Sequence, residues 1–511
     1  MGQYQTMKIL LSAKIFMWTI FVPLLLSAAP AFAQDSVRDL VVKIHTTRRD
    51  PDLTRPWTKH NPVNVSGSGV VIQGKRILTN AHVVQNASQI YVQPNQSADK
   101  LAARIVVIAE AVDLALLSVD DESFFDKRAF LHFAEDLPKV KDAVSVYGFP
   151  TGGTELSVTE GIVSRIEFTG FYQFAHGLRI QVDAALNPGN SGGPVVSRGR
   201  LVGIVFSNIP NAQSIGYVIP IEEVRLFLDD AADGRYDGKP QLHDRFQTVE
   251  NDALRRKLGL AKGVGGLMIA ELYKNDANNP LKEGDVITAI GGQSIDSDGK
   301  VTVRYDLRLS ALYLVQKYAK DGMLDVSLLR DGKPMRLTVP VARQRELVVP
   351  YLQNRSPRYF IYGPLVFCTA TQEYIEKLGN QWELFHTRAG NSLILRRFEK
   401  PAFPGEEIVI VCSPMLPHPI AKGYDDPNNY VVSEVDGVPI KNLKHLVEVL
   451  RDGTSREVTF KFARMTNRNR ENMVFDRRAM LAATEDILKE FGIRYQFSED
   501  LKPVWDVAQK R

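Results

Sequence analysis

The chain has 511 residues, which is enough for about three domains of ordinary size. Its composition, 44% hydrophobic and 24% charged, is typical of folded globular proteins and excludes a largely disordered chain. The formal net charge of +4 is small for this length, so we expect no nucleic-acid partner. The sequence has no G-x-x-x-x-G-K-[ST] phosphate loop and no Cys/His metal cluster, so we expect no ATP dependence, no metal and no cofactor.

Residues 1–33 have the pattern of a signal peptide for export. Lys8 and Lys14 supply positive charge, residues 15–27 form an apolar stretch, and the string A-F-A at 31–33 is a small-x-small cleavage site. An uncleaved membrane anchor is the alternative, but the cleavage site and a proline in the apolar stretch favour removal. We therefore expect a soluble periplasmic protein with no stable membrane span after signal cleavage.

Residues 35–230 read as one domain built from strands. Short apolar segments alternate with turns rich in Gly, Pro and Asp, a pattern that predicts two β-barrels. Residues 221–230 carry apolar side chains at helical spacing and should form the helix that closes this domain. The polar, Gly-rich stretch 231–240 then predicts a linker.

One serine of this domain lies in a loop that suits a nucleophile, the string G-N-S-G-G-P at residues 189–194. A serine hydroxyl needs a neighbouring base, for which His82 is the candidate, and the base needs an orienting acid, for which Asp113 is the candidate. The chain order His, Asp, Ser predicts a chymotrypsin-type barrel pair rather than a subtilisin or α/β-hydrolase fold. The N–H groups of Gly189 and Ser191 would then form the oxyanion hole. The alternatives to these catalytic roles are that Ser191 lies in a simple Gly-rich turn and that Asp113 caps the end of a strand.

Three strings, T-N-A-H-V-V, D-L-A-L-L and G-N-S-G-G-P, occur in this order around the three residues, and together they resemble the HtrA/Deg family of serine proteases. The string Y-G-F-P-T-G-G and the long tail most resemble the plant-type Deg branch. The resemblance implies a mainly β protein, with a chymotrypsin-like double β-barrel followed by two PDZ-like α+β domains. It also implies homo-oligomers built from trimers and a specificity pocket near Leu186, Ile204 and Phe206. Because these three side chains are apolar, we expect cleavage after small or medium aliphatic residues.

The tail contains a weak internal repeat that predicts two copies of one module. The string V-I-T-A-I-G-G-Q-S-I at 286–295 matches V-V-S-E-V-D-G-V-P-I at 431–440 in pattern. We expect one PDZ-like domain at 245–345 and a divergent second one at 350–500. The second copy lacks the L-x-x-G-D run of the first, so a role in interaction or oligomerisation is preferred over peptide binding.

Two strings of the first module resemble PDZ features. L-K-E-G-D-V-I at 281–287 resembles the PDZ signature, and G-L-M-I at 266–269 resembles the loop whose N–H groups hold a peptide carboxylate. Such domains bind an extended peptide by adding a strand to their sheet. A role in assembly or gating alone is the alternative. The only cysteines, Cys368 and Cys412, are compatible with one disulfide or with two buried thiols.

The resemblance implies an ATP-independent serine endopeptidase that degrades unfolded or damaged exported proteins through an acyl-enzyme. Its partners would be unfolded protein or peptide substrates. The competing hypothesis is a peptide-binding chaperone or scaffold with minor proteolysis, in which the PDZ-like tail does most of the binding.

Overall fold

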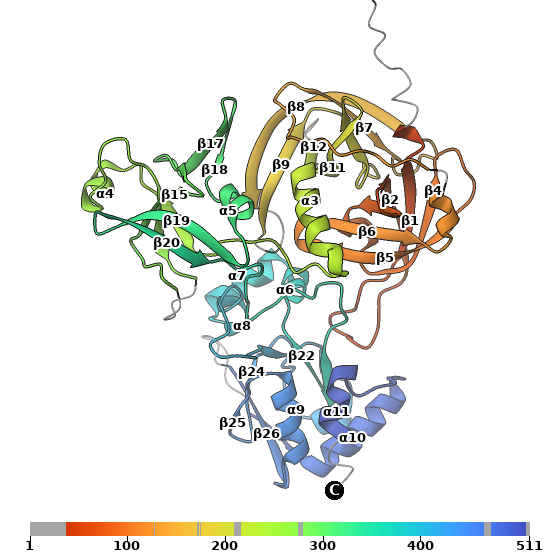
Figure 1. The fold of residues 1–511 in the computed structure, drawn as a ribbon. Helices are drawn as coiled ribbons and strands as arrows, with labels where there is room; N and C mark the ends of the chain where they lie inside the picture. Colours follow the sequence, from red (N-terminus) through yellow and green to blue (C-terminus); the bar gives the residue numbers. More distant parts are fainter. Residues whose placement is uncertain are drawn as a thin grey trace, which may run out of the picture.

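The computed structural model describes residues 37–506 except 127, 171–172, 174, 209–215, 274–278 and 464–471, so the predicted signal peptide lies outside the described residues. The chain forms three parts, which Figure 1 shows in order along the colour bar. A double β-barrel comes first, then a green unit of about residues 241–345 (the middle unit), then a teal-to-blue unit of residues 348–506 (the C-terminal unit). The prediction of a mainly β fold with two barrels is confirmed.

The two barrels are closed, with six strands each. The first has the strand order β1-β2-β3-β6-β5-β4 and the second β10-β11-β12-β9-β8-β7. The first barrel comprises β1 (Val41–Arg48), β2 (Val63–Ile72), β3 (Arg76–Thr79), β4 (Ala87–Pro94), β5 (Leu101–Ala109) and β6 (Leu114–Val119). The second comprises β7 (Ala143–Gly148), β8 (Ser157–Gly170), β9 (His176–Val182), β10 (Pro194–Ser197), β11 (Arg200–Asn208) and β12 (Gly216–Pro220). Every residue of β6 is buried, which explains why its sequence is continuously apolar around one serine.

Short helices connect these strands: α2 (Ala81–Val84), η1 (Glu110–Val112), η2 (Glu122–Phe125), α3 (Ile221–Asp230) and η3 (Ala231–Asp233). Helix α3 is the closing helix that the apolar spacing predicts. Its first turn carries Glu222 and Glu223, whose negative charges stabilise the helix by interacting with the positive end of its dipole. Val224 and Phe227 are buried against the barrels.

The middle unit is built on a sheet of order β13-β14-β15-β19-β20, with β16 paired to β15. Its elements are β13 (Arg245–Thr248), α4 (Asp252–Lys257), β14 (Leu267–Glu271), β15 (Val286–Ile290), β16 (Gln293–Ser294), β17 (Lys300–Arg304), β18 (Leu307–Ser310), α5 (Tyr313–Tyr318), β19 (Met323–Arg330) and β20 (Lys333–Pro340). The prediction that residues 266–269 hold a peptide carboxylate is wrong. Two of their N–H groups are already used within the protein, since Gly266 donates to the Asp296 carbonyl at 3.0 Å and Ile269 to the Asp285 carbonyl at 2.9 Å. The strand that they enter, β14, is paired with β13 on one edge and β15 on the other, so β13 lies at the edge of the sheet.

The C-terminal unit has two small sheets, β21-β22-β23 and β25-β24-β26-β27, with helices packed around them. Its strands are β21 (Tyr359–Tyr362), β22 (Leu365–Thr369), β23 (Val409–Val411), β24 (Val432–Val435), β25 (Val438–Pro439), β26 (Glu457–Phe462) and β27 (Met473–Asp476). Its helices are α6 (Gln372–Leu378), α7 (Asn380–Arg388), α8 (Ser392–Leu395), η4 (Pro419–Ala421), α9 (Leu443–Asp452), α10 (Arg477–Glu490), η5 (Glu499–Leu501) and α11 (Lys502–Asp506). The two copies of the sequence repeat fold alike, as the hairpins β15–β16 and β24–β25.

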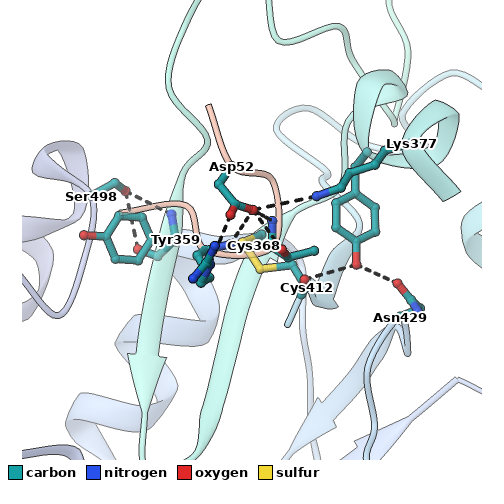
Figure 2. Close-up of a disulfide and its surroundings, with 10 residues drawn as sticks. Asp52, Tyr359, Cys368, Lys377, Cys412, Asn429 and Ser498 are labelled. Atoms are coloured by element: carbon teal, nitrogen blue, oxygen red, sulfur yellow. Dashed lines mark hydrogen bonds and ion pairs between the residues drawn. A yellow bond between two sulfur atoms is a disulfide. The ribbon is translucent and has the colours of Figure 1, made fainter. Parts of the chain in front are cut away.

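Cys368 of β22 and Cys412, directly after β23, form a disulfide, with their Cα atoms 5.8 Å apart. Of the two states that the sequence left open, the structure therefore has the bridged one. The Tyr374 hydroxyl lies 3.2 Å from the carbonyl of Cys412 and 2.6 Å from Oδ1 of Asn429 (Figure 2). The bridge joins β22 to the end of β23, and Tyr374 ties this end of the sheet to helix α6.

The loop between β1 and β2 reaches from the first barrel onto the C-terminal unit and passes over the disulfide (Figure 2). Leu53 and Trp57 of this loop pack on the apolar cluster that contains both cysteines. The rings of Trp57 and Tyr359 are 6.0 Å apart in an edge-to-face arrangement. Asp52 and Lys377 of helix α6 form an ion pair of 3.7 Å. The loop therefore fastens the C-terminal unit to the barrels.

Asp52 organises this loop, and its charge should stabilise the docked arrangement. The side chain is 3% exposed. Its carboxylate accepts hydrogen bonds from the N–H and hydroxyl of Thr54, at 2.9 and 2.8 Å, and from Arg55. Burial alone would raise the pKa of Asp52, but these hydrogen bonds outweigh it and hold the pKa well below its usual range.

Asp52→Asn should therefore lower the free energy of unfolding at pH 7 by about 1.5–3 kcal/mol, the usual scale for hydrogen bonds to a charged group. A carboxyl whose folded-state pKa is depressed stabilises above its unfolded pKa of about 3.9 and loses that effect as pH falls through the folded value. The difference between wild type and variant, measured by denaturant unfolding, should thus shrink below about pH 4. Asp126→Asn, at a side chain 62% exposed, is the control and should change little at either pH.

Candidate active site

A cavity of about 1040 Å³ lies where the two barrels meet, and it brings His82, Asp113 and Ser191 together. His82 is in α2, directly after β3, and Asp113 lies between η1 and β6, so both come from the first barrel. Ser191 precedes β10 and comes from the second barrel. The three residues that the sequence selects therefore line one pocket, although more than a hundred residues separate the first from the last.

The histidine and aspartate are held in one geometry by three hydrogen bonds. His82 Nδ1 lies 2.7 Å from Asp113 Oδ2, and the His82 backbone N–H donates to Asp113 Oδ1 at 2.9 Å. The Asn80 side-chain amide donates to the Asp113 carbonyl at 2.9 Å. Asp113 is 3% exposed, whereas the His82 side chain is 47% exposed. The ring is thus anchored through Nδ1, which leaves Nε2 as the nitrogen available to a reacting group.

The loop before Ser191 has its carbonyl groups held by neighbouring segments. The Pro188 carbonyl accepts a hydrogen bond from the Thr151 N–H at 2.7 Å. Ser68 donates twice, from its hydroxyl to the Gly189 carbonyl at 2.8 Å and from its N–H to the Ser191 carbonyl at 2.9 Å. Gly189 has a φ of +99°, a backbone conformation that a side chain would strain. These hydrogen bonds hold the backbone on both sides of Ser191 in one conformation.

The N–H groups of Gly189 and Ser191 have a different environment from these carbonyls. Among the residues that the structure describes, neither N–H donates a hydrogen bond to a protein group, and none links the Ser191 hydroxyl to His82. Both N–H groups are therefore available to an external acceptor. In enzymes without substrate, catalytic hydrogen bonds are often long and shorten only in the complex, so the geometry is compatible with nucleophilic catalysis.

The glycine after the serine leaves no room for a side chain. Gly192 has a φ of +84°, and a Cβ at this position would lie 2.2 Å from the Ser68 carbonyl oxygen and 2.3 Å from Thr79 Oγ1. Gly192→Ala should displace the Ser191 loop and lower the rate of peptide cleavage roughly 10²–10³-fold, the scale of losing one oxyanion donor. Gly74→Ala is the matched control, because Gly74 has a φ of +88° but nothing within 4 Å of its Cβ position. Equal rates for the two variants would contradict this account.

The three predicted specificity residues lie in different surroundings. Phe206 lines the cavity, Ile204 is fully buried in the apolar core of the barrels, and Leu186 packs beside Gly216 at the second barrel. The guanidinium of Arg179 lies over the Phe206 ring, 4.5 Å from its centroid. Sequence reasoning missed this arginine because nothing in the pattern of β9 distinguishes it from a surface cation.

The C-terminal unit also reaches the cavity, which no motif predicts. Tyr351, Glu373 and Glu376 line it together with Glu110, three residues before Asp113. Burial raises the pKa of Glu110, a hydrogen bond from Gln173 opposes this, and the charge of Glu373 adds to it. Tyr351, Glu373 and Glu376 are remote in sequence from the strings around His82, Asp113 and Ser191, so only the docking of the units shows that they line the same cavity.

Within the described part of the chain, no helix is long and apolar enough to cross a membrane. In that same part, no group of three or more His, Cys, Asp or Glu side chains is arranged to hold a metal ion.

Comparisons with known proteins agree on one family. Residues 67–204 match the family model for a trypsin-like peptidase domain, and residues 348–500 match that for a PDZ domain. The chain is 36% identical to Protease Do-like 2, chloroplastic, from Arabidopsis thaliana over 92% of this chain and 77% of that protein. It is also 36% identical to the mitochondrial Protease Do-like 4 of the same plant, over 80% of this chain and 76% of that protein.

Two other similarities are more limited in extent. A probable periplasmic serine endoprotease, DegP-like, from Halomonas elongata is 33% identical over 54% of this chain and 56% of its own. Among solved structures, the HtrA-type protease AlgW with decapeptide is 25% identical with a TM-score of 0.47, over 61% of this chain and 97% of that one. The plant relatives cover most of both chains at more than one-third identity. The chain belongs to the HtrA/Deg family of serine proteases, as its motifs predict, and it is a serine endopeptidase similar to the plant Deg branch.

Proposed function

We propose that this chain is an ATP-independent endopeptidase in which Ser191 is the nucleophile, His82 the general base and Asp113 the group that orients the histidine. The observation that carries the proposal is the 2.7 Å contact between His82 Nδ1 and Asp113 Oδ2 in a pocket that Ser191 also lines. A carboxylate on Nδ1 fixes the tautomer in which Nε2 can accept a proton.

The reaction then proceeds through an acyl-enzyme. His82 Nε2 takes the proton of the Ser191 hydroxyl as its oxygen attacks the scissile carbonyl. The N–H groups of Gly189 and Ser191 donate to the oxyanion that forms, since no protein group occupies them among the described residues. His82 passes the proton to the leaving amine, and water attacks the acyl-enzyme with the same histidine as base.

The proposed substrates are unfolded or damaged exported proteins. Unfolded chains present both apolar side chains and extended backbone, and the apolar ring of Phe206 in the pocket supports cleavage after small or medium aliphatic residues. A periplasmic location rests on the signal pattern of residues 1–33 and on the periplasmic relative, whereas the plant relatives are chloroplastic or mitochondrial. Homo-oligomers built from trimers are proposed from the family resemblance.

The test is covalent labelling of the purified protein. Unfolded casein should be degraded without ATP, and a fluorophosphonate should stop the degradation while adding its mass to the peptide that contains Ser191. Labelling of another serine with the same loss of activity would contradict the assignment of the nucleophile. Suppression of casein aggregation by the fully labelled protein at low molar ratio would support the chaperone alternative beside the protease.

A further inference from the structure

A second cavity, of about 1540 Å³, lies between the first barrel and the C-terminal unit. It shares the lining residues Glu110, Gln173 and Tyr351 with the cavity that contains Ser191, so the two cavities lie next to each other. One wall is strand β5, and the other walls come from the linker at 234–243 and from residues 343–358 and 400–407. Figure 1 shows β5 on the side of the barrel that faces the C-terminal unit.

Strand β5 has an edge without a strand partner along this cavity. It pairs with β6 from Ala103 to Ala109, but with β4 only from Leu101 to Ala103. Beyond Ala103, β4 diverges and continues to pair with β1 alone. Among the described residues, no backbone hydrogen bond from another segment takes up this edge between residues 104 and 109.

The cavity follows the edge of β5 rather than one of its faces. Five consecutive residues, 105–109, line it. The register of β5 shifts between Ile105 and Val107, but from Val106 onward partly exposed and buried residues alternate. Val107 and Ala109 are buried in the barrel, so a surface that touches them as well as Ile108 must reach the backbone edge. The side chains of Ile105, Val106 and Ile108 are only partly buried, and they are apolar. This segment therefore offers unpaired backbone groups together with partly exposed apolar side chains.

We propose that this edge is an exosite, where an extended segment of the substrate polypeptide adds as a strand to residues 104–109 of β5. The proposal rests on the proposed function. Unpaired strand edges bind extended chains through backbone hydrogen bonds, which require no particular sequence. Three lining residues shared with the Ser191 pocket favour the substrate as the occupant, because a chain bound along β5 would lie next to the pocket in which it is cut.

The exosite predicts a difference between long and short substrates. Val106→Glu places a charged side chain where the added strand would pack. It should raise KM for unfolded casein roughly tenfold, the scale of one to two net hydrogen bonds, and leave kcat/KM for a chromogenic tetrapeptide unchanged. Ala102→Glu is the matched control, because Ala102 lies on the same strand, is exposed, is paired with Tyr91 and is outside the cavity. Equal KM values for casein in both variants would overturn the proposal.

Hydrogen exchange provides a measurement that needs no variant of β5. In Ser191→Ala protein saturated with unfolded casein, those amides of residues 104–109 that do not donate to β6 should exchange at least about tenfold more slowly than without casein, since new hydrogen bonds protect them. Unchanged exchange there, or protection only at β13, would overturn the exosite. Protection that depends on protein concentration without casein would assign the edge to a second copy. Failure of the proposed function would instead show as an uncleaved tetrapeptide, which leaves the two results distinguishable.

Discussion

Replacing Ser191 by alanine is expected to lower kcat for unfolded casein and for a short peptide by about 10⁶-fold, the scale measured in the subtilisin triad. The hydroxyl is the only group of this side chain that can form the acyl-enzyme, so no covalent intermediate remains. The fold should be unaffected, because the Ser191 backbone contact to Ser68 does not involve the hydroxyl. The variant should therefore unfold at the same denaturant midpoint as the wild type.

Ser66→Ala is the matched control for this experiment. Ser66 lines the same cavity, and the change removes the same hydroxyl. Its rate should stay within a few-fold of the wild-type rate. Casein loss at the wild-type rate in the Ser191→Ala protein would show that another group is the nucleophile. A comparable loss of activity in both variants would show that the effect is not specific to Ser191, which contradicts its assignment as the nucleophile.

The strands of the barrels, helix α3 and the three candidate site residues can be predicted from the sequence, because each depends mainly on residues close to it in the chain. Turn residues between apolar segments mark the strands of the barrels, and the helical spacing of apolar residues marks α3 (Ile221–Asp230). The strings around His82, Asp113 and Ser191 each combine a reactive side chain with the strand or loop that holds it. Their surroundings could therefore be interpreted one segment at a time.

The remaining features depend on packing between segments that are distant in sequence. The string G-L-M-I at 266–269 resembles a carboxylate-binding loop, but the N–H groups of Gly266 and Ile269 donate to carbonyls of the protein itself. Tyr351 and Glu373 reach the cavity that contains Ser191 only because the β1–β2 loop and the C-terminal unit are docked. The free edge of β5 exists because β4 pairs with it only as far as Ala103. The sequence of β5 alone does not show where this pairing ends.

Asp113→Asn should lower kcat by about 10⁴-fold, as the equivalent change does in the reference triad, while the protein remains folded. An asparagine keeps the shape of the side chain and an oxygen for the His82 backbone N–H. Its amide would, however, face His82 Nδ1 as a donor, so the ring would adopt the tautomer with its proton on Nε2. That tautomer cannot accept the proton of Ser191.

The control for the acid is Asp120→Asn, because Asp120 follows the same strand, β6, and is 61% exposed beside Arg104. Its rate should match the wild type, since an exposed ion pair contributes little. The informative comparison is between kcat and fluorophosphonate labelling. If Asp113 acts through the histidine, both the turnover and the labelling rate of Ser191 should fall together. A variant with normal labelling but slow turnover would place the role of Asp113 after acylation, and a normal rate in both would exclude it as the orienting acid.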